Sequence, residues 1–191
     1  MTKSFLSTVL ITGLMSAQTV FATVPTLAMT FDTNVTPIGT TSSQEAKIQA
    51  AEMKIKDVVG SEEFRSAVLN HTYGGKKTFV DNKGLTNAQI YQKILDGAET
   101  LQPKKNNAMD MSVKLYYQNS IVVGYTTTGS KTINMNTKYF NTYTSSGVSH
   151  NMMHEWLHKL GFTHATSYTV SRNYSVPYAI GNIMGKLAFK Y

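Results

Sequence analysis

The chain carries three histidines at the spacing of a metal site, within the segment His-Glu-Trp-Leu-His-Lys-Leu-Gly-Phe-Thr-His that runs from His154 to His164. On a helix, His154 and His158 project from the same face one turn apart, so both imidazoles can reach one metal ion. Glu155 lies roughly 100° around the helix from His154. Its carboxylate is therefore expected beside the metal, where it can take a proton from a metal-bound water and later return it.

Gly161 explains how a third histidine can join the first two. A helix that continued would carry His164 away from the metal, whereas a glycine just after the helix can adopt the left-handed conformation that ends it. Three neutral imidazoles leave the fourth tetrahedral position of a zinc ion open for water, which is the arrangement of catalytic sites. The segment therefore predicts one catalytic Zn2+ bound by His154, His158 and His164, with Glu155 as the general base.

This extended motif resembles the signature of the metzincin metallopeptidases, H-E-x-x-H-x-x-G-x-x-H followed by a turn that contains methionine, the Met-turn. The resemblance implies that Met184, the only methionine after His164, forms an apolar floor beneath the three imidazoles. Several metzincin groups also have a tyrosine two residues after that methionine, where this chain has Lys186. Tyr178 is our candidate for an auxiliary tyrosine at the zinc, and Tyr174 is the second candidate.

The metzincin resemblance also implies that an edge strand of the sheet binds an extended substrate by main-chain hydrogen bonds, a form of β-augmentation. For our candidate segment, residues 121–125, the alternative is an ordinary interior strand. The residue after the third histidine, which often separates the named metzincin groups, is Ala165, and it does not assign the chain to astacins, serralysins, matrixins or adamalysins. The candidate edge-strand residues are Ile121, Val122, Val123, Gly124 and Tyr125.

Residues 1–22 have the pattern of a secretory signal peptide. Lys3 supplies an early positive charge, residues 5–15 form a short apolar run, and Val20-Phe21-Ala22 is a small-residue cleavage site. The run is too short for an ordinary transmembrane helix, and no later segment is long and apolar enough to be one. We expect a protein exported by a bacterium to the periplasm or the medium. The chain has no cysteine, which fits that setting better than a disulfide-rich secreted scaffold.

The rest of the chain is predicted to form an arm and one domain. Residues 23–41 are rich in Thr and Pro and are expected to be an extended arm or a short pro-segment. Within it, Phe31-Asp32 lies in a surface loop or, alternatively, places a carboxylate on the zinc. Residues 42–191 are enough for one hydrophobic core and too few for two domains. We expect this single zinc-peptidase domain to be a monomer.

Helical patterns occupy the first part of the domain. Ser42-Ser43-Gln44-Glu45 is a capping-box pattern, apolar residues follow at helical spacing until Gly60, and Ser61 begins a second, short helix. Thr86-Asn87-Ala88-Gln89 is another capping-box pattern. Its helix is expected to run as far as Leu101 and to pack behind the sheet.

Strand patterns occupy the middle of the domain. Residues 109–117 alternate between apolar and polar side chains, which predicts a strand with one buried face, and residues 76–80, 121–126 and 131–136 are predicted to be shorter strands. The active-site helix is expected to begin after Ser146. Together with the resemblance, these patterns predict a metzincin-like α+β fold. We expect a twisted mixed sheet of about four to five strands, a backing helix, the active-site helix and a small C-terminal subdomain.

The formal net charge of +7 is concentrated in the half of the chain that contains the histidines. Residues 106–191 contain seven Lys or Arg against two Asp or Glu, whereas residues 23–105 contain ten against nine. A positive field raises the local concentration of anionic partners, so acidic peptides or anionic envelope polymers are expected substrates. Solubility and adhesion to the cell surface are the alternative explanation. No nucleic-acid-binding motif is present, and we expect no nucleic-acid partner.

The sequence thus favours a secreted zinc-dependent endopeptidase that hydrolyses peptide bonds by a zinc-bound water, with Glu155 as general base. Two alternatives stay open. One is a zinc-dependent amide hydrolase that acts on cell-wall peptidoglycan, and the other is a non-catalytic envelope-binding module whose zinc only stabilises the fold. Three imidazoles also bind divalent metals other than zinc.

Overall fold

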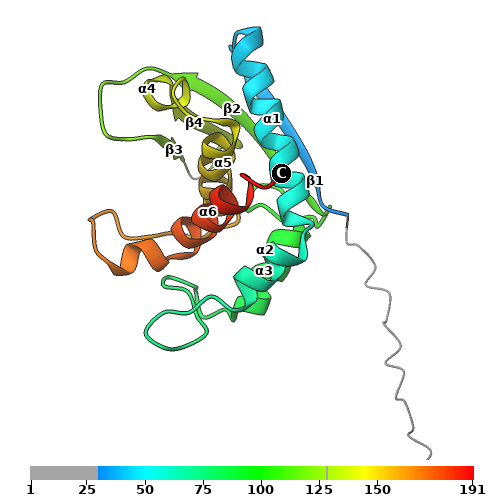
Figure 1. The fold of residues 1–191 in the computed structure, drawn as a ribbon, viewed down its shortest axis with the longest axis vertical. Helices are drawn as coiled ribbons and strands as arrows, with labels where there is room; N and C mark the ends of the chain where they lie inside the picture. Colours follow the sequence, from blue (N-terminus) through cyan, green and yellow to red (C-terminus); the bar gives the residue numbers. More distant parts are fainter. Residues whose placement is uncertain (1–29, 128) are drawn as a thin grey trace, which may run out of the picture.

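The computed structural model describes residues 30–127 and 129–191. The predicted signal peptide and residues 23–29 of the predicted arm lie outside the described residues. Within the described ranges the chain forms a mixed α+β fold with one four-stranded sheet and six α-helices (Figure 1). In chain order the elements are β1 (Asp32–Ile38), α1 (Ser42–Val59), α2 (Glu62–Leu69), α3 (Asn87–Asp96), β2 (Ala108–Tyr116), β3 (Gly124–Thr126), β4 (Thr132–Asn136), α4 (Thr137–Phe140), α5 (Ser145–Lys159), the 3-10 helix η1 (Ser171–Tyr174) and α6 (Val176–Leu187).

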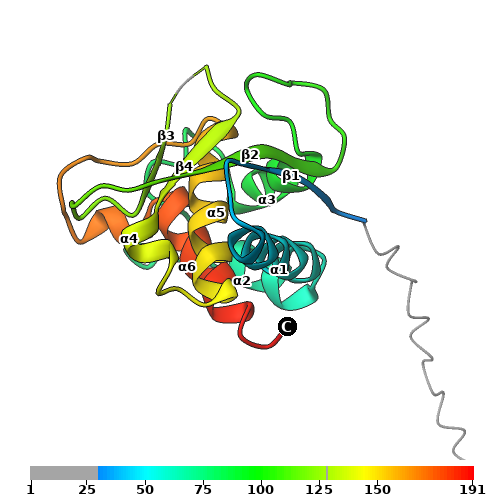
Figure 2. The ribbon, with the colours of Figure 1, turned by 90° about the horizontal axis from the view of Figure 1, so that it is seen from above.

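The sheet is mixed and has the strand order β1-β2-β4-β3. β2 pairs in parallel with β1 on one side and with β4 on the other, and β3 pairs antiparallel with β4. The alternation predicted for the long central strand is confirmed for Met109, Met111 and Val113, which are buried, and Lys114, which is exposed. It is wrong at Tyr117, which lies beyond the end of β2 and is exposed. Helices α1, α5 and α6 lie on one side of the sheet (Figure 2).

Strand β1 occupies part of the segment expected to be an arm or a pro-segment. Phe31 is buried just before it, with its ring centroid 6.0 Å from that of Trp156. Asp32 pairs with Lys56 of α1 at 3.0 Å. The alternative in which Asp32 reached the metal site is wrong, because β1 and β3 are opposite edges of the sheet and the metal site lies near β3.

Helices α1 and α2 form where the sequence predicts them, with one shift in a cap. The capping box of α1 uses Thr41 rather than Ser42: the Thr41 hydroxyl accepts from the Gln44 N–H, and the Gln44 side chain accepts from the Thr41 N–H. The box pairs a hydroxyl with an amide three residues later, and Thr41 with Gln44 satisfies that spacing. Gly60 ends α1 and Ser61 caps α2, as predicted.

Helix α3 is shorter than the sequence predicts, and it does not pack behind the sheet as predicted. The capping box of Thr86 and Gln89 is confirmed. The helix then ends at Asp96 because Gly97 adopts a left-handed conformation with φ of 62°, and Leu101 lies beyond it, exposed. α3 packs mainly against α2, whereas α1 packs against β1 and α5. The backing helix of the sheet is therefore α1.

Replacing Gly97 with alanine is expected to destabilise the domain by several kcal/mol. An added Cβ would lie 2.1 Å from the Ala108 carbonyl oxygen and 2.6 Å from its nitrogen, at the start of β2. Gly84 is the matched control, because its φ is +77° and a Cβ there meets nothing within 4 Å. Both variants carry left-handed strain of about 1 kcal/mol, and only Gly97→Ala adds the clash. Equal losses in urea unfolding of the two variants would contradict this prediction.

Two predicted strands differ from the structure. Residues 76–80 form no strand: single bridges join Tyr73 to Lys76 and Val80 to Ser175. β3 begins at Gly124 rather than at Ile121. The preceding segment is joined to the end of β4 by Asn136, whose N–H donates to the Val123 carbonyl at 2.8 Å and whose side-chain amide donates to the Val122 carbonyl at 3.0 Å.

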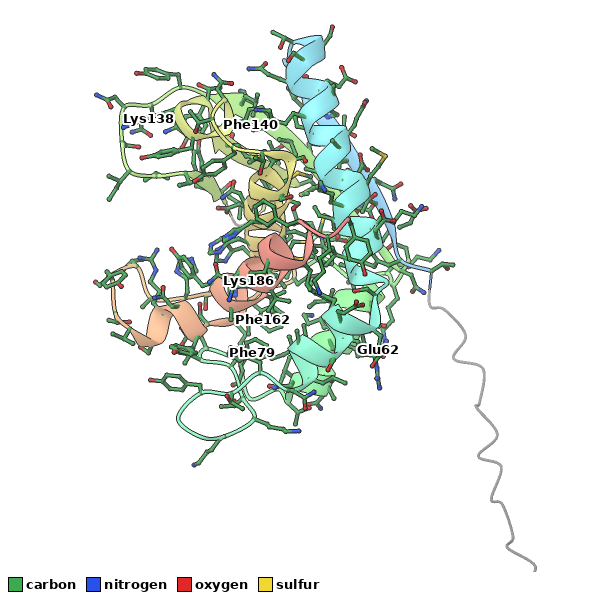
Figure 3. All side chains as sticks on the ribbon, viewed as in Figure 1. Glu62, Phe79, Lys138, Phe140, Phe162 and Lys186 are labelled. Carbon is green, nitrogen blue, oxygen red and sulfur yellow. The ribbon has the colours of Figure 1, made fainter. Side chains whose placement is uncertain are left out.

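The described residues share one hydrophobic core. Phe79, Phe140 and Phe162, which come from three separate segments, are all buried in it (Figure 3). Ile180 and Met184 of α6 are fully buried in the same cluster, so the C-terminal segment belongs to the common core instead of forming the predicted small subdomain. Among the described residues no helix is long and apolar enough to cross a membrane.

Candidate metal centre

The three histidines of the motif converge in space. Their candidate ligand nitrogens all lie within 4.8 Å of one another, and the Nε2 atoms of His154 and His164 are 3.3 Å apart. In a tetrahedral site with metal–nitrogen bonds of about 2.0–2.1 Å, two ligand nitrogens stand about 3.3–3.4 Å apart. His154, His158 and His164 are therefore close enough to bind one metal ion, and the His154–His164 pair has the separation of two ligands on such an ion.

A Schellman turn at the end of α5 brings the third histidine into place. Gly161 has a φ of +91° and donates its N–H to the His158 carbonyl, and Phe162 donates to the Leu157 carbonyl. These are the two hydrogen bonds of that motif, which ends a helix with a glycine in the left-handed region. The role predicted for Gly161 is confirmed, and the chain turns back so that His164 faces the helix.

Backbone carbonyls orient the imidazoles. The Nδ1 atom of His158 lies 2.8 Å from the Phe162 carbonyl oxygen, and the Nδ1 atom of His164 lies 2.9 Å from that of Ala165. The Pro177 backbone hydrogen-bonds to His154, and proline offers only its carbonyl for this. An Nδ1–H that donates to a carbonyl leaves Nε2 with a lone pair for a metal. The fold thus presents three aligned nitrogen ligands.

Burial sets the protonation of the centre. Desolvation, with a smaller contribution from the neighbouring imidazoles, lowers the pKa of His154 to about 2, and desolvation also lowers the pKa of His158. Neutral imidazole is the form that binds a metal. Desolvation raises the pKa of Glu155 to about 7, and the charge of Lys159 opposes that rise. A carboxyl group with such a pKa can both accept and release a proton near neutral pH.

The histidines lie in an open cleft of about 1100 Å³. One wall is β3 with the segment before it, and the other includes the segment after His164, drawn in orange (Figure 1). All five predicted edge-strand residues line this cleft. A side chain at Gly124 would place Cβ 2.7 Å from the Asn151 Oδ1 atom, so glycine lets β3 lie directly against α5.

Tyr178 lies at the centre of the site, as predicted for an auxiliary tyrosine. Its ring centroid is 4.5 Å from that of His154 and 4.7 Å from that of His164. Tyr174 instead packs against Tyr73, with centroids 5.1 Å apart, and does not line the cleft. Of the two candidate tyrosines, α6 brings Tyr178 to the histidines.

The Met-turn prediction needs correction. Met184 is fully buried within helix α6 rather than in a turn, because the last segment of the chain stays helical from Val176 to Leu187. Besides Tyr178, Gly181 of α6 approaches His154, where an added Cβ would lie 3.4 Å from the His154 Cβ. Lys186, at the position of the family tyrosine, is exposed.

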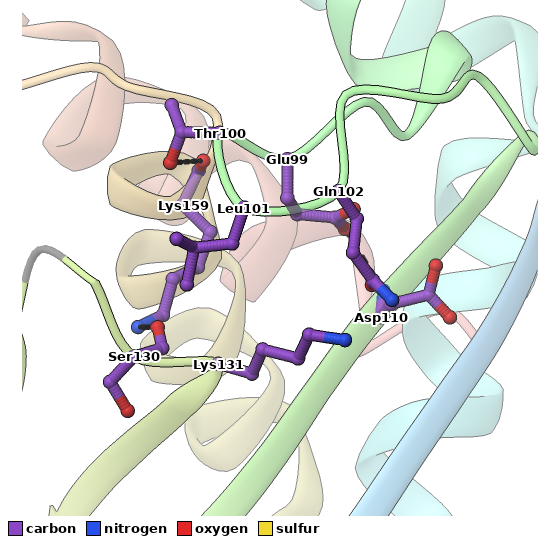
Figure 4. Close-up of a pocket in the computed structure, with 8 residues that line it drawn as sticks. All are labelled: Glu99, Thr100, Leu101, Gln102, Asp110, Ser130, Lys131 and Lys159. Carbon is purple, nitrogen blue, oxygen red and sulfur yellow. Dashed lines mark hydrogen bonds between the residues drawn. The ribbon is translucent and has the colours of Figure 1, made fainter.

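Lys159, at the end of α5, joins this helix to the loop between β3 and β4. It is 6% exposed, and its Nζ donates to the Ser130 carbonyl, to the Thr132 carbonyl at 3.1 Å and to the Thr127 carbonyl at 3.5 Å. Lys159 also lines a pocket of about 10 Å³, enough for one water molecule, beside Thr100 and Ser130 (Figure 4). The ammonium group therefore holds the cleft wall against α5.

Glu99 fixes the buried side of the same helix. Its Oε1 accepts hydrogen bonds from the Trp156 Nε1–H at 2.6 Å and from the Asp110 N–H at 3.0 Å. Burial raises the pKa of this carboxyl group, and the hydrogen bonds oppose that rise. Glu99 thus ties α5 to β2 through Trp156, the residue after Glu155.

Replacing Lys159 with methionine is expected to cost roughly 2 kcal/mol of stability, because three carbonyls lose a charged donor in a buried place. Lys131→Met is the control, since Lys131 is exposed in the same loop, and should change stability by less than about 0.5 kcal/mol. Urea unfolding measures both variants, and equal midpoints would contradict the role given to Lys159.

Three residues of the cleft were missed by sequence reasoning. Asn151 and Lys159 lie on α5, four residues before and four residues after Glu155. Helical spacing alone could therefore have placed both near Glu155. Arg172 was harder to find, because it comes from the irregular segment after His164. Its signal is composition: apart from Arg65, it is the only arginine in a chain with 18 Lys and Arg.

Comparisons with known proteins give no match: no protein-family model, no curated protein and no solved structure matches this chain.

Proposed function

We propose that this protein is an exported, zinc-dependent endopeptidase of the metzincin type. The observation that carries the proposal is the convergence of three imidazole nitrogens beside a buried carboxylate, Glu155, in an open cleft. Three neutral histidines suit zinc, and a site with three protein ligands has the form of catalytic rather than structural zinc sites. The signal-peptide pattern of residues 1–22 supports export.

The chemistry is hydrolysis of an amide. A zinc ion held by the three histidines would polarise the substrate carbonyl and lower the pKa of a bound water. Glu155 takes a proton from the attacking water as oxygen bonds to the carbonyl carbon. Glu155 then gives that proton to the leaving nitrogen as the carbon–nitrogen bond breaks. The products are a carboxylic acid and an amine, and Glu155 returns to its starting state.

Two further parts of the cleft position the substrate. The segment from Ile121 to Tyr125 borders the cleft along the sheet edge, where an extended peptide can pair with its main chain. The Tyr178 hydroxyl accepts a hydrogen bond from Arg172, which leaves its own proton free to donate. We assign that proton to the substrate carbonyl oxygen, where negative charge develops in the transition state.

A cell-wall amide hydrolase is the second candidate, and the charge of the cleft favours it. Among the described residues that line the cleft, Glu155 is the only acid, whereas Lys83, Lys159 and Arg172 are basic. Such a lining suits anionic polymers of a bacterial envelope. Peptidoglycan cross-links are amides, so the same catalytic groups would serve.

The deciding experiment offers the zinc-loaded protein, without residues 1–22, a mixed peptide library and purified cell walls. Cleavage of peptides supports the endopeptidase, and the cut sites report its specificity. Soluble fragments from cell walls with the peptides intact support the amide hydrolase. Zinc binding without cleavage of either would refute both and leave the zinc-stabilised binding module.

A further inference from the structure

Arg172 is separated from the three histidines by the ring of Tyr178. It belongs to η1, it lines the cleft, and its guanidinium lies over the Tyr178 ring with the central carbon 4.6 Å from the ring centroid. The same Tyr178 ring also contacts the histidines, with its centroid 4.5 Å from that of His154. A group bound by Arg172 would therefore lie next to the group that reacts.

Much of the hydrogen-bonding capacity of Arg172 is unused. A guanidinium carries five N–H donors. In the described part of the chain its side chain makes one hydrogen bond, from Nη2 to the Tyr178 hydroxyl, so the donors of Nη1 are unused; Nε is buried and has no partner. The ion pairs found among the described residues are Lys56–Asp32, Arg65–Glu62 and Lys105–Asp96, so no carboxylate of those residues forms an ion pair with Arg172. The cleft presents a cation without a counter-charge.

The position of Arg172 is fixed before any ligand binds. Its backbone N–H donates to the Thr169 carbonyl and hydroxyl, and its carbonyl accepts from the Ser175 hydroxyl at 2.7 Å. The ring of Tyr178 supports the guanidinium plane. Arginine differs from lysine in offering a planar fork that matches a carboxylate, and this chain, which otherwise uses lysine for nearly all its cations, has arginine here.

We propose that Arg172 binds a carboxylate of the substrate next to the bond that is cut, so that the cleft selects peptides with an acidic group at that place. The inference rests on the proposed peptidase function and specifies its substrate class. The carboxylate can be an Asp or Glu side chain or the free C-terminus of the peptide, and the two sources share the same chemistry.

The test uses zinc-loaded protein and matched pairs of peptides built around the cut sites found with the library. In one series Glu is exchanged for Gln on either side of the cut bond, and in another the free C-terminus is exchanged for an amide. The measured quantity is the ratio of kcat/KM between the acidic and the neutral peptide of each pair. This ratio cancels any general damage to the enzyme.

We expect a ratio of at least about 10 for the protein with Arg172, mostly through KM, because a charge-assisted hydrogen bond is lost in the neutral peptide. In Arg172→Gln the ratio should fall to about 1, and in Arg172→Lys it should fall in between. Arg65→Gln, at the exposed arginine, should keep the ratio of the parent protein. The series that shows the ratio identifies the source of the carboxylate.

Two results would overturn the proposal. A ratio near 1 in the parent protein shows that the cleft does not select a carboxylate, and an unchanged ratio in Arg172→Gln shows that another group selects it. If the parent protein cuts no peptide, the peptidase function fails separately. Titration calorimetry with library peptides synthesised as Glu and Gln pairs, and as free-acid and amide pairs, then tests Arg172 by binding alone: binding that ignores the carboxylate contradicts the role, and carboxylate-dependent binding lost in Arg172→Gln supports it.

Discussion

Glu155→Gln is expected to lower kcat/KM for peptide hydrolysis by at least about 10²-fold while the protein keeps its zinc. The Glu155 side chain is 4% exposed, and glutamine fills the same space without a new cavity. The amide cannot take a proton from water and return it to an amine. Because the loss affects proton transfer rather than substrate binding, it should appear in kcat, with KM nearly unchanged.

The measurement compares steady-state kinetics and zinc content in the same preparations. Glu45→Gln, at an exposed position in the first turn of α1, is the matched control and should keep full activity. Loss of zinc together with activity in Glu155→Gln would mean that the residue supports the metal instead of moving protons. Full activity of that variant would exclude Glu155 as the general base.

His158→Gln should abolish both zinc binding and the stabilisation that zinc provides. A ligand that binds only the folded state at 1,000 times its Kd stabilises a protein by about 4 kcal/mol. For a domain of this size that raises Tm by roughly 8–16 °C. His158 supplies one of three nitrogens held in register by backbone carbonyls, and two nitrogens do not replace the set.

Calorimetry with and without zinc measures this effect, and a chelator should reverse it in the parent protein. His150→Gln is the control, because His150 lines the cleft but does not belong to the group of three histidines. That variant should keep the zinc-dependent rise in Tm. A similar rise in His158→Gln would show that the metal is bound elsewhere.

The sequence predicted the convergence of the three histidines better than the rest of the fold, for a physical reason. His154 and His158 are related by the period of a helix, and Gly161 ends that helix through hydrogen bonds to residues only a few positions away. Local rules of this kind also predicted α2 and the caps at Ser61 and Thr86. Spacing along the chain is enough wherever the interacting atoms are sequence neighbours.

The errors come from contacts between distant segments. Apolar spacing cannot show that α1 rather than the helix after Thr86 covers the sheet, because both have an apolar face. Met184 has the right composition for a Met-turn but continues a helix that is buried against α5. The contact between Arg172 and Tyr178 spans only six residues, but it depends on the angle at which η1 meets α6. None of these arrangements produces a repeating pattern of residue types that could be recognised in a single sequence.

The parallel pairing of β1 with β2 also constrains the order in which the molecule folds. Asn34 and Asp110, whose side chains bond across this pair, are 76 residues apart, so their contact closes a long loop and forms slowly compared with helices α1 and α2. Phe31, just before β1, packs against Trp156 of α5, so this contact forms only when α5 is in place. A nascent chain can form its first helices early, but the N-terminal strand and the histidine-bearing helix must become ordered in one late, cooperative step.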